Sequence, residues 1–261
     1  MVRDAAQVTG RLVRLGALPE SERRDVLRAT HALEGRIFRS VEPFESYAAR
    51  VLNPGVSDAW VWLLEDAGAL VGYNVILYRA RDYRGERIGV YNANVGLLPE
   101  YRGHNRTVAT GLRLAIPRLL LEPHRRLYFH AYLMSPSIYV MMDKYSDQMW
   151  PAPRTDPPSD DVLALVEYLR AESGPPRWDP ANPWVVRLPT SIDENDDELA
   201  AWRTSDRPSV RYFFEKNPHY RDGGALVLLV PLTLANLLRA VGRLAARQVG
   251  FARPKPQRQP A

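Results

Sequence analysis

The chain of 261 residues contains no cysteine. Disulfide bonds, cysteine-ligated zinc and a thiol nucleophile are therefore excluded. The sequence also lacks the Gly-x-Ser-x-Gly elbow of serine hydrolases and the phosphate loop of nucleotide-binding proteins. Its histidines lack the spacing of metal ligands; they are His31, His104, His124, His130 and His219. We therefore expect no metal and no covalent cysteine intermediate.

Acidic residues are absent from the end of the chain, between Gly223 and Ala261. The basic residues of that stretch are Arg239, Arg243, Arg247, Arg253, Lys255 and Arg258. The net charge is +5, and the first 222 residues carry 29 basic and 30 acidic side chains. A near-neutral body argues against a nucleic-acid-binding core, whereas the basic end suits an anionic partner, most simply a membrane surface. The alternative is a solvated basic tail.

A hydrophobic run long enough to cross a bilayer is also lacking. The uncharged apolar run that begins at Ala225 stops at Leu238, whereas a spanning helix needs about 20 residues. Arginines then recur every four residues, which predicts a basic amphipathic helix over residues 232–249. We expect this segment to make peripheral membrane contact from Leu232 to Arg258. The alternative is that it covers a groove on its own domain or in a homodimer.

The composition is that of a globular protein, with 46% hydrophobic and 25% charged residues. Residues 1–15 are mixed polar and basic and do not form a charged-then-apolar signal sequence. We therefore expect a cytoplasmic protein that is peripheral at the inner face of the membrane through its basic end.

Hydrophobic periodicity predicts a mixed order of helices and strands in the first 150 residues. Helices are expected over residues 19–35, 44–52, 107–121 and 135–145. Strands are expected over residues 59–64, 69–79, 88–97 and 127–134, the first two joined as a hairpin. Ser21 and Ser135 are the expected N-caps of the first and fourth helices. Pro117 should kink or shorten the third helix.

Prolines interrupt the chain after residue 150, and four of them lie in residues 151–158. Beyond this loop the patterns predict a helix over 160–172, a short strand over 184–188 and a helix ending near 202. They also predict a helical or extended segment over 208–215 and a strongly apolar strand over 225–230.

The stretch from Ile88 to Ala115 organises the first part of the chain. A strand there turns sharply into a helix, which places unpaired main-chain N–H groups and the positive end of the helix dipole at the strand end. Such a corner suits an anion such as phosphate. The alternative is an ordinary strand–turn–helix without a ligand.

This corner resembles the acyl-CoA-binding signature of the GNAT acyltransferase superfamily, roughly R/Q-x-x-G-x-G/A after the central strand. Arg102 stands at its first position, and Asn105 and Thr107 replace its two later small residues. The predicted order of elements over residues 20–150 is similar to that superfamily as well. The resemblance implies an α+β fold, with a mixed, largely antiparallel sheet flanked by helices in an α/β/α arrangement. A C-terminal helical and strand extension would follow.

The resemblance also implies a division of the chain and a donor site. Residues 1–150 would form the acyltransferase core, 151–231 would complete the sheet and the acceptor side, and 232–261 would form the basic helix and tail. The co-substrate would be acyl-CoA, or the phosphopantetheine of an acyl carrier protein. Its expected binding residues are Val95, Leu97, Arg102, Gly103, His104, Asn105, Arg106, Thr107 and Val108.

Three residues are candidates for catalysis. His130 is the first candidate for the base that accepts the proton of the amine, because its ordinary pKa lies near neutrality; the alternative is a structural histidine. Asn94 would orient the acceptor, or would simply be polar on a sheet face. Met142 stands where the superfamily has the tyrosine that protonates the leaving thiolate. Either Tyr139, one turn earlier, or Tyr145, three residues later, would substitute if the helix is rotated or shifted, and Tyr139 is the candidate taken here.

The function predicted from these patterns is transfer of an acyl group from a thioester to an amine by direct attack. The apolar and basic end of the chain favours a long acyl chain or a lipid-like substrate. The alternatives are an acetyl-CoA-dependent N-acetyltransferase with a dimerising tail, and a catalytically inactive binding protein with this fold. The acceptor cannot be read from the sequence.

Overall fold

Eight strands form one sheet in the described part of the computed structural model, which covers residues 8–102, 106–155, 157–172, 177–178, 182–192 and 196–251. The strand order is β1-β2-β3-β4-β5-β8-β7-β6. Every neighbouring pair with a recorded register is antiparallel except β4 and β5, which are parallel. The predicted α+β fold with a largely antiparallel sheet is therefore confirmed.

The strands are β1 (Thr9–Arg14), β2 (Asp58–Asp66), β3 (Ala69–Tyr83), β4 (Glu86–Leu97), β5 (Arg126–Leu133), β6 (Arg177–Trp178), β7 (Val185–Arg187) and β8 (Gly224–Pro231). The helices are α1 (Glu20–Ile37), α2 (Phe44–Val51), α3 (Arg106–Leu121), α4 (Pro136–Tyr145), α5 (Asp160–Glu172), α6 (Asp196–Arg203), α7 (Pro208–Lys216) and α8 (Leu234–Phe251). Short 3-10 turns precede α1, α3 and β8: η2 (Leu15–Ala17), η3 (Pro99–Tyr101) and η4 (Tyr220–Asp222).

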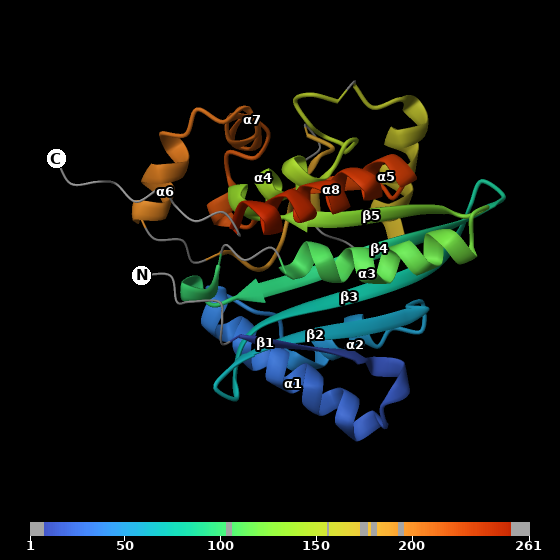
Figure 1. The fold of residues 1–261 in the computed structure, drawn as a ribbon, viewed down its shortest axis with the longest axis vertical. Helices are drawn as coiled ribbons and strands as arrows, with labels where there is room; N and C mark the ends of the chain where they lie inside the picture. The colour runs from blue at the N-terminus through green and yellow to red at the C-terminus, as the bar shows by residue number, and fades with distance from the viewer. Residues whose placement is uncertain are drawn as a thin grey trace.

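Helices cover both faces of the sheet (Figure 1). Because successive side chains of a strand point to opposite faces, Val75 and Leu77 of β3 pack with α1 and α2, whereas Ile76 and Tyr78 pack with α3. The α1 face continues under α5, where Val90 of β4 is buried. The other face continues under α4 and α7. The sheet therefore separates two apolar layers.

The C-terminal part of the chain completes the sheet. All eight residues of β8 are buried, because β5 and β7 flank the strand and helices cover both of its faces. The strand reads as a continuous apolar run for the same reason.

Several local predictions are confirmed. Ser135 caps α4 by accepting a hydrogen bond from the main-chain N–H of Ser137 at 3.2 Å. The hairpin between β2 and β3 turns on Ala67 and Gly68, whose φ angles are 47° and 79°. Both angles are positive, as the tight turn that continues the twist of the two strands requires. The segment around residues 208–215 is helical, as α7.

Three predictions about the elements were wrong or incomplete. Ser21 does not cap α1: the helix begins at Glu20 with Pro19 at the cap, and Ser21 lies inside its first turn. Pro117 lies inside α3, which continues to Leu121, so the helix is not shortened, and the alternative of a kink stays a prediction. The edge strand β1 was missed, because its short mixed polar sequence carries little periodicity and its pairing to β2 supplies the order.

Two parts of the chain that are distant in sequence meet just beyond the end of α1. Phe38, just after α1, forms a β-bridge with Ile192. The main-chain N–H of Arg39 donates to Ser191 O at 3.0 Å, and Ser40 Oγ donates to Pro189 O at 2.8 Å. The loop between α1 and α2 is thus joined to residues 189–192, and we name this contact the loop crossing.

Candidate active site

The parallel strands β4 and β5 pair over a short distance and then diverge. Their register runs from Ile88 opposite Arg126 to Tyr91 opposite Phe129, and no pairing between them is recorded in the described residues beyond that point. From there β4 continues along β3 to Leu97, and β5 continues along β8. Figure 1 shows the two strands close together at their beginnings and apart at their ends.

Where β4 and β5 begin to diverge, the side chain of Asn92 takes the place of a main-chain hydrogen bond between the two strands. Asn92 follows Tyr91, and its Nδ2 donates to the main-chain oxygen of His130 at 2.8 Å. Its Oδ1 in turn accepts from Arg79 Nη1 at 2.6 Å. The amide therefore satisfies a carbonyl of β5 at the point where the ladder stops, which lets the strands separate without leaving this group unpaired.

A buried carboxyl group lies over β4 beyond this point. Glu34 of α1 is 5% exposed, and its Oε1 accepts from Asn94 Nδ2 at 2.6 Å and from Tyr73 Oη at 2.8 Å. Burial raises the pKa of Glu34 above its ordinary value, and the two hydrogen bonds and the charges of Arg50 and His31 oppose the rise. Asn94 is therefore brought into a polar group with Glu34.

His130 lies in the interior on the same sheet face. It is 1% exposed, and burial, with a smaller effect of Arg79, lowers its pKa to about 4. Its Nδ1 lies 3.4 Å from Asn92 Nδ2, and its Nε2 has no hydrogen-bond partner among the described residues. The ring meets that of Tyr132 edge-on, with 5.2 Å between the centroids. His130 is therefore neutral near pH 7, and its role as the base stays a prediction.

Tyr139 lies on α4 in the apolar layer of the opposite sheet face. It is fully buried, and its hydroxyl donates to Pro151 O at 3.0 Å. Burial raises its pKa far above the ordinary value of a tyrosine. The structure does not bring Tyr139 together with Asn94 or Glu34 through any recorded contact, and its role as proton donor stays a prediction.

The predicted donor corner lies at the end where β4 and β5 are apart. The helix α3 begins at Arg106 and carries no acidic residue in its first turn. Of the residues expected to bind the donor, Val95 and Leu97 lie on β4, Arg102 ends the turn η3, and Val108 is in the first turn of α3; all four are half-buried. Gly103, His104 and Asn105 lie outside the described residues, as do the side chains of Arg106 and Thr107.

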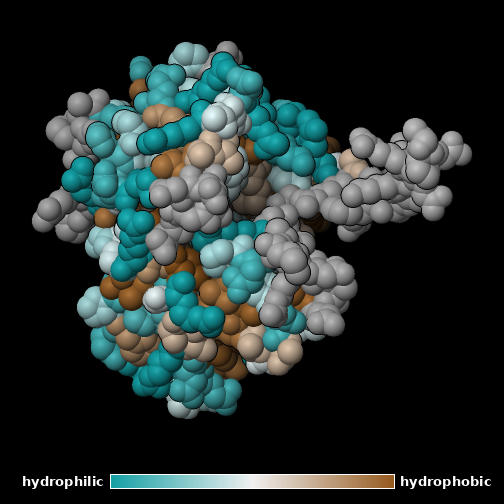
Figure 2. Space-filling view, turned by 90° about the vertical axis from the view of Figure 1, so that its left-hand side faces the viewer, coloured by the Kyte–Doolittle hydropathy of each residue, from teal (hydrophilic) through white to brown (hydrophobic). Residues whose placement is uncertain are grey.

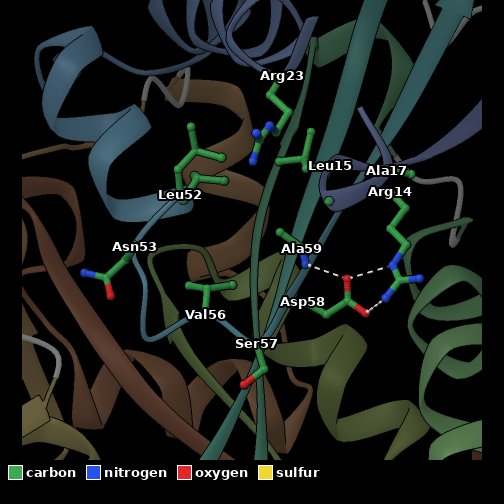
Figure 3. Close-up of a pocket in the computed structure, with 12 residues that line it drawn as sticks. Arg14, Leu15, Ala17, Arg23, Leu52, Asn53, Val56, Ser57, Asp58 and Ala59 are labelled. Carbon is green, nitrogen blue, oxygen red and sulfur yellow. Dashed lines mark hydrogen bonds and ion pairs between the residues drawn. The ribbon is translucent and has the colours of Figure 1, made fainter. Parts of the chain in front are cut away.

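A separate hollow of about 310 Å³ lies between η2, the end of α2 and the start of β2 (Figure 3). Arg14 and Asp58 pair at its edge, at 2.8 Å, and Arg23 and Leu52 also line it. None of the residues around the divergence of β4 and β5 lines this hollow, so we do not place the candidate site there.

Sequence patterns missed two polar residues of this arrangement, Glu34 and Tyr73. Glu34 falls on the inward face of α1 beside Leu27, Thr30 and Leu33. An acidic residue at such a position is rarely buried without a partner, and this was the available signal. Among the described residues, no three His, Asp or Glu side chains gather to hold a metal ion.

No protein-family model and no curated protein sequence matches the chain. Among solved structures, the AHL synthase LasI matches with a TM-score of 0.42 and 11% identity, over 90% of this chain and 95% of that one. FeeM, an N-acyl amino acid synthase from uncultured soil microbes, matches with a TM-score of 0.35 and 16% identity, over 56% and 81% of the two chains. The GNAT family N-acetyltransferase YhbS from Escherichia coli, solved in complex with CoA, matches with a TM-score of 0.36 and 16% identity, over 54% and 70%. Solved structures similar to this chain therefore include an AHL synthase, an N-acyl amino acid synthase and a GNAT family N-acetyltransferase.

Proposed function

We propose that this protein transfers an acyl group from a thioester, acyl-CoA or an acyl carrier protein, to an amine by direct attack. The observation that carries the proposal is the divergence of β4 and β5 after Tyr91 and Phe129. Beyond it, no pairing with β5 is recorded in the described residues, and the main-chain groups of β4 on that side would meet the donor. An extended thioester arm has the shape and the amide groups to meet them. The sequence contains no cysteine to hold an acyl intermediate, so the amine attacks the thioester itself.

The phosphates of the donor would lie at the start of α3. Main-chain N–H groups of a first helical turn are unpaired and point outward, and the helix dipole favours a negative charge there. The first turn of α3 carries no acidic residue that would repel a phosphate, as is also true of α4, α7 and α8, whereas α1 and α5 carry two each. The loop from Arg102 to Val108 would supply the remaining contacts.

The thioester oxygen would be held by a main-chain N–H of β4 between Val95 and Leu97. Charge develops on this oxygen as the amine attacks, and a fixed donor aimed at it lowers the barrier. Gly96 lies in this stretch with the ring of Tyr73 against it, since an added Cβ would come within 2.4 Å of that ring. The backbone is thereby held close to the residues that surround Glu34.

We further propose a long acyl chain or a lipid-like substrate. Figure 2 shows the side of the molecule toward which β4 points. Hydrophobic residues gather in the lower half of this side, whereas its upper half is mostly hydrophilic. Each methylene buried from water contributes about 0.8 kcal/mol. An apolar channel of modest length would therefore discriminate strongly against an acetyl donor.

Thiol release tests the function. Purified protein would be mixed with acetyl-CoA or palmitoyl-CoA and with glycine, hexylamine or spermidine, and free thiol would be measured together with the N-acyl product by mass spectrometry. We expect amine-dependent thiol release that is faster with the palmitoyl donor. Faster turnover of acetyl-CoA would overturn the long-chain proposal, and absence of turnover with tight CoA binding would favour a binding protein.

The proposed membrane contact rests on an apolar stripe on α8. None of the described helices has the length and apolar content to pass through a bilayer. Leu234, Leu238 and Val241 nevertheless stand 63%, 62% and 44% exposed, and their spacing places them on one face of α8. Leu120 and Leu121 at the end of α3, a helix that contacts α8, are also exposed. Together with the acid-free, basic end of the chain, this surface suits an anionic lipid interface.

Replacing Leu234 and Leu238 together with glutamate is expected to reduce binding to anionic vesicles by tenfold or more. Each leucine contributes about 1.5 kcal/mol or more on burial, and each glutamate adds repulsion. Sedimentation with vesicles of phosphatidylcholine and phosphatidylglycerol measures the bound fraction. Leu163→Glu, an exposed leucine of α5 on the other sheet face, is the matched control. Equal binding by the double variant and this control would remove the membrane contact.

A further inference from the structure

We propose that Glu34 is the general base of the site: its carboxylate accepts the proton of the attacking amine. The inference rests on the proposed acyl transfer and adds to it the residue that acts on the acceptor. It arises from the position of α1, which places this carboxyl over β4 where β4 has lost β5 as a neighbour.

The carboxyl group of Glu34 lies next to the part of β4 that no longer pairs with β5. Glu34 Oε1 lies 2.6 Å from Nδ2 of Asn94, and Asn94 is three residues beyond Tyr91, the last residue of β4 that pairs with β5. A thioester held along β4 between the diverging strands would have its carbonyl within reach of this carboxyl, directly or through one water. The acceptor would approach on the α1 face, below the loop crossing.

The recorded hydrogen bonds to the carboxyl group of Glu34 reach one of its two oxygens. Tyr73 and Asn94 both donate to Oε1, at 2.8 and 2.6 Å. Both donors orient the group, and Oε2 has no hydrogen-bond partner among the described residues. One oxygen is thus anchored while the other is open to a proton, as a positioned base requires.

Nearby charges affect the pKa of Glu34 less than burial does. The ionisable groups that face Glu34 are Tyr73 of β3, Tyr47 and Arg50 of α2, and His31 of its own helix. Arg50 also pairs with Glu42 at 2.5 Å, which divides its charge between two carboxylates. Burial therefore outweighs the favourable charges, and the pKa of Glu34 is raised toward the range in which a carboxylate accepts a proton efficiently.

The proposed transfer of the acyl group from sulfur to nitrogen conserves electrons and protons. The lone pair of the amine nitrogen forms the N–C bond, and the carbonyl electron pair moves to oxygen. The carboxylate of Glu34 takes a proton from the nitrogen. The oxygen pair then reforms the carbonyl as the C–S bond breaks, and the sulfur leaves with its electrons. Glu34 returns the proton to this thiolate, so that one amide and one thiol leave the site and the carboxylate is regenerated.

The rival base is His130. The side chain of His130 is buried. Among the described residues, its recorded hydrogen-bond partner is Asn92. Glu34 retains 5% exposure and makes its contacts on the far side of Asn92 from His130, at Asn94. His130 would therefore act on the backbone geometry at the divergence and not on the amine.

Glu34→Gln tests the proposal, because glutamine keeps an oxygen that can accept from Tyr73 and Asn94 but takes up no proton. With palmitoyl-CoA and hexylamine, we expect kcat to fall by about 10²–10⁴-fold while the melting temperature stays near that of the unchanged protein. Glu22→Gln, on an exposed position of the same helix, is the matched control and should retain full activity. Glu34→Asp, which restores a shorter carboxylate, should recover part of the rate.

The pH profile separates catalysis from structure. In the unchanged protein kcat should rise with pH as Glu34 ionises, at a higher pH than an ordinary glutamate would give, and this limb should be missing in Glu34→Gln. A Glu34→Gln variant within threefold of the parent, with the same limb, would overturn the inference and leave acyl transfer standing. Failure of the unchanged protein to release thiol would remove acyl transfer and the role of Glu34 together.

Discussion

Replacing Phe213 with alanine is expected to lower the free energy of unfolding by about 3–5 kcal/mol, as truncation of a fully buried aromatic side chain does. Phe213 is fully buried on α7 and lies at the centre of an aromatic cluster that joins α7 to α4 and η4. Its ring centroid lies 5.8 Å from that of Tyr139 and 5.6 Å from that of Tyr220. The alanine variant would leave a cavity between elements that cannot close over it without moving the sheet.

Urea unfolding followed by tryptophan fluorescence measures this effect, as a fall of the midpoint at an unchanged slope. Arg211→Ala, on the same helix, is the control: Arg211 is exposed and pairs only with the exposed Asp206 among its recorded contacts, so its change should stay within about 0.5 kcal/mol. A loss below 1 kcal/mol for Phe213→Ala would contradict the described packing of α7.

Replacing Asn236 with leucine, which has a similar size, is expected to lower the free energy of unfolding by on the order of 4 kcal/mol. Asn236 is buried at the start of α8, and its Oδ1 accepts from the main-chain N–H groups of Asp147 and Gln148, at 2.5 and 2.8 Å. Its Nδ2 donates to the carbonyls of Gln148 and Pro231, at 2.9 and 2.6 Å. Leucine would leave these main-chain groups without partners, at about 1–3 kcal/mol for each one that water does not reach.

Arg239→Gln is the matched control for this prediction. Arg239 lies one turn further along α8 and reaches the same loop, through an ion pair with Asp147 at 3.0 Å. Both partners are partly exposed, so the pair contributes no more than about 1 kcal/mol. Thermal unfolding of the two variants should separate them clearly, and equal melting temperatures would show that Asn236 does not hold α8 to the chain after α4.

The elements were largely predictable from the sequence because their periodicity is strong. The apolar runs of β3 and β8 and the amphipathic pattern of α1 each indicate their structure within a window of about ten residues. The residues that join elements were not predictable. Asn236 carries no local pattern that distinguishes it from a polar residue on a helix surface. The inward position of Glu34 on α1 indicates burial, but only the fold shows which residues it meets.

The candidate site was predictable only in part, for the same reason. The strand–turn–helix around Arg102 is local, so its place at the end of β4 follows from the sequence. The end of the β4–β5 ladder at Tyr91, and the amide of Asn92 that replaces the next main-chain bond, depend on contacts between segments about 38 residues apart. Asn94 was singled out from its strand face, but its partner Glu34 lies 60 residues away.

The loop crossing between Ser40 and residues 189–192 bears on where the chain opens locally. It lies one helical turn beyond Glu34 along α1, and its hydrogen bonds are exposed to water. Each such bond contributes only about 0.5–1.5 kcal/mol, so the two segments can part and rejoin by local fluctuation while the sheet beneath stays intact. Main-chain amides of the loop crossing should therefore exchange with solvent sooner than those of the sheet beneath it.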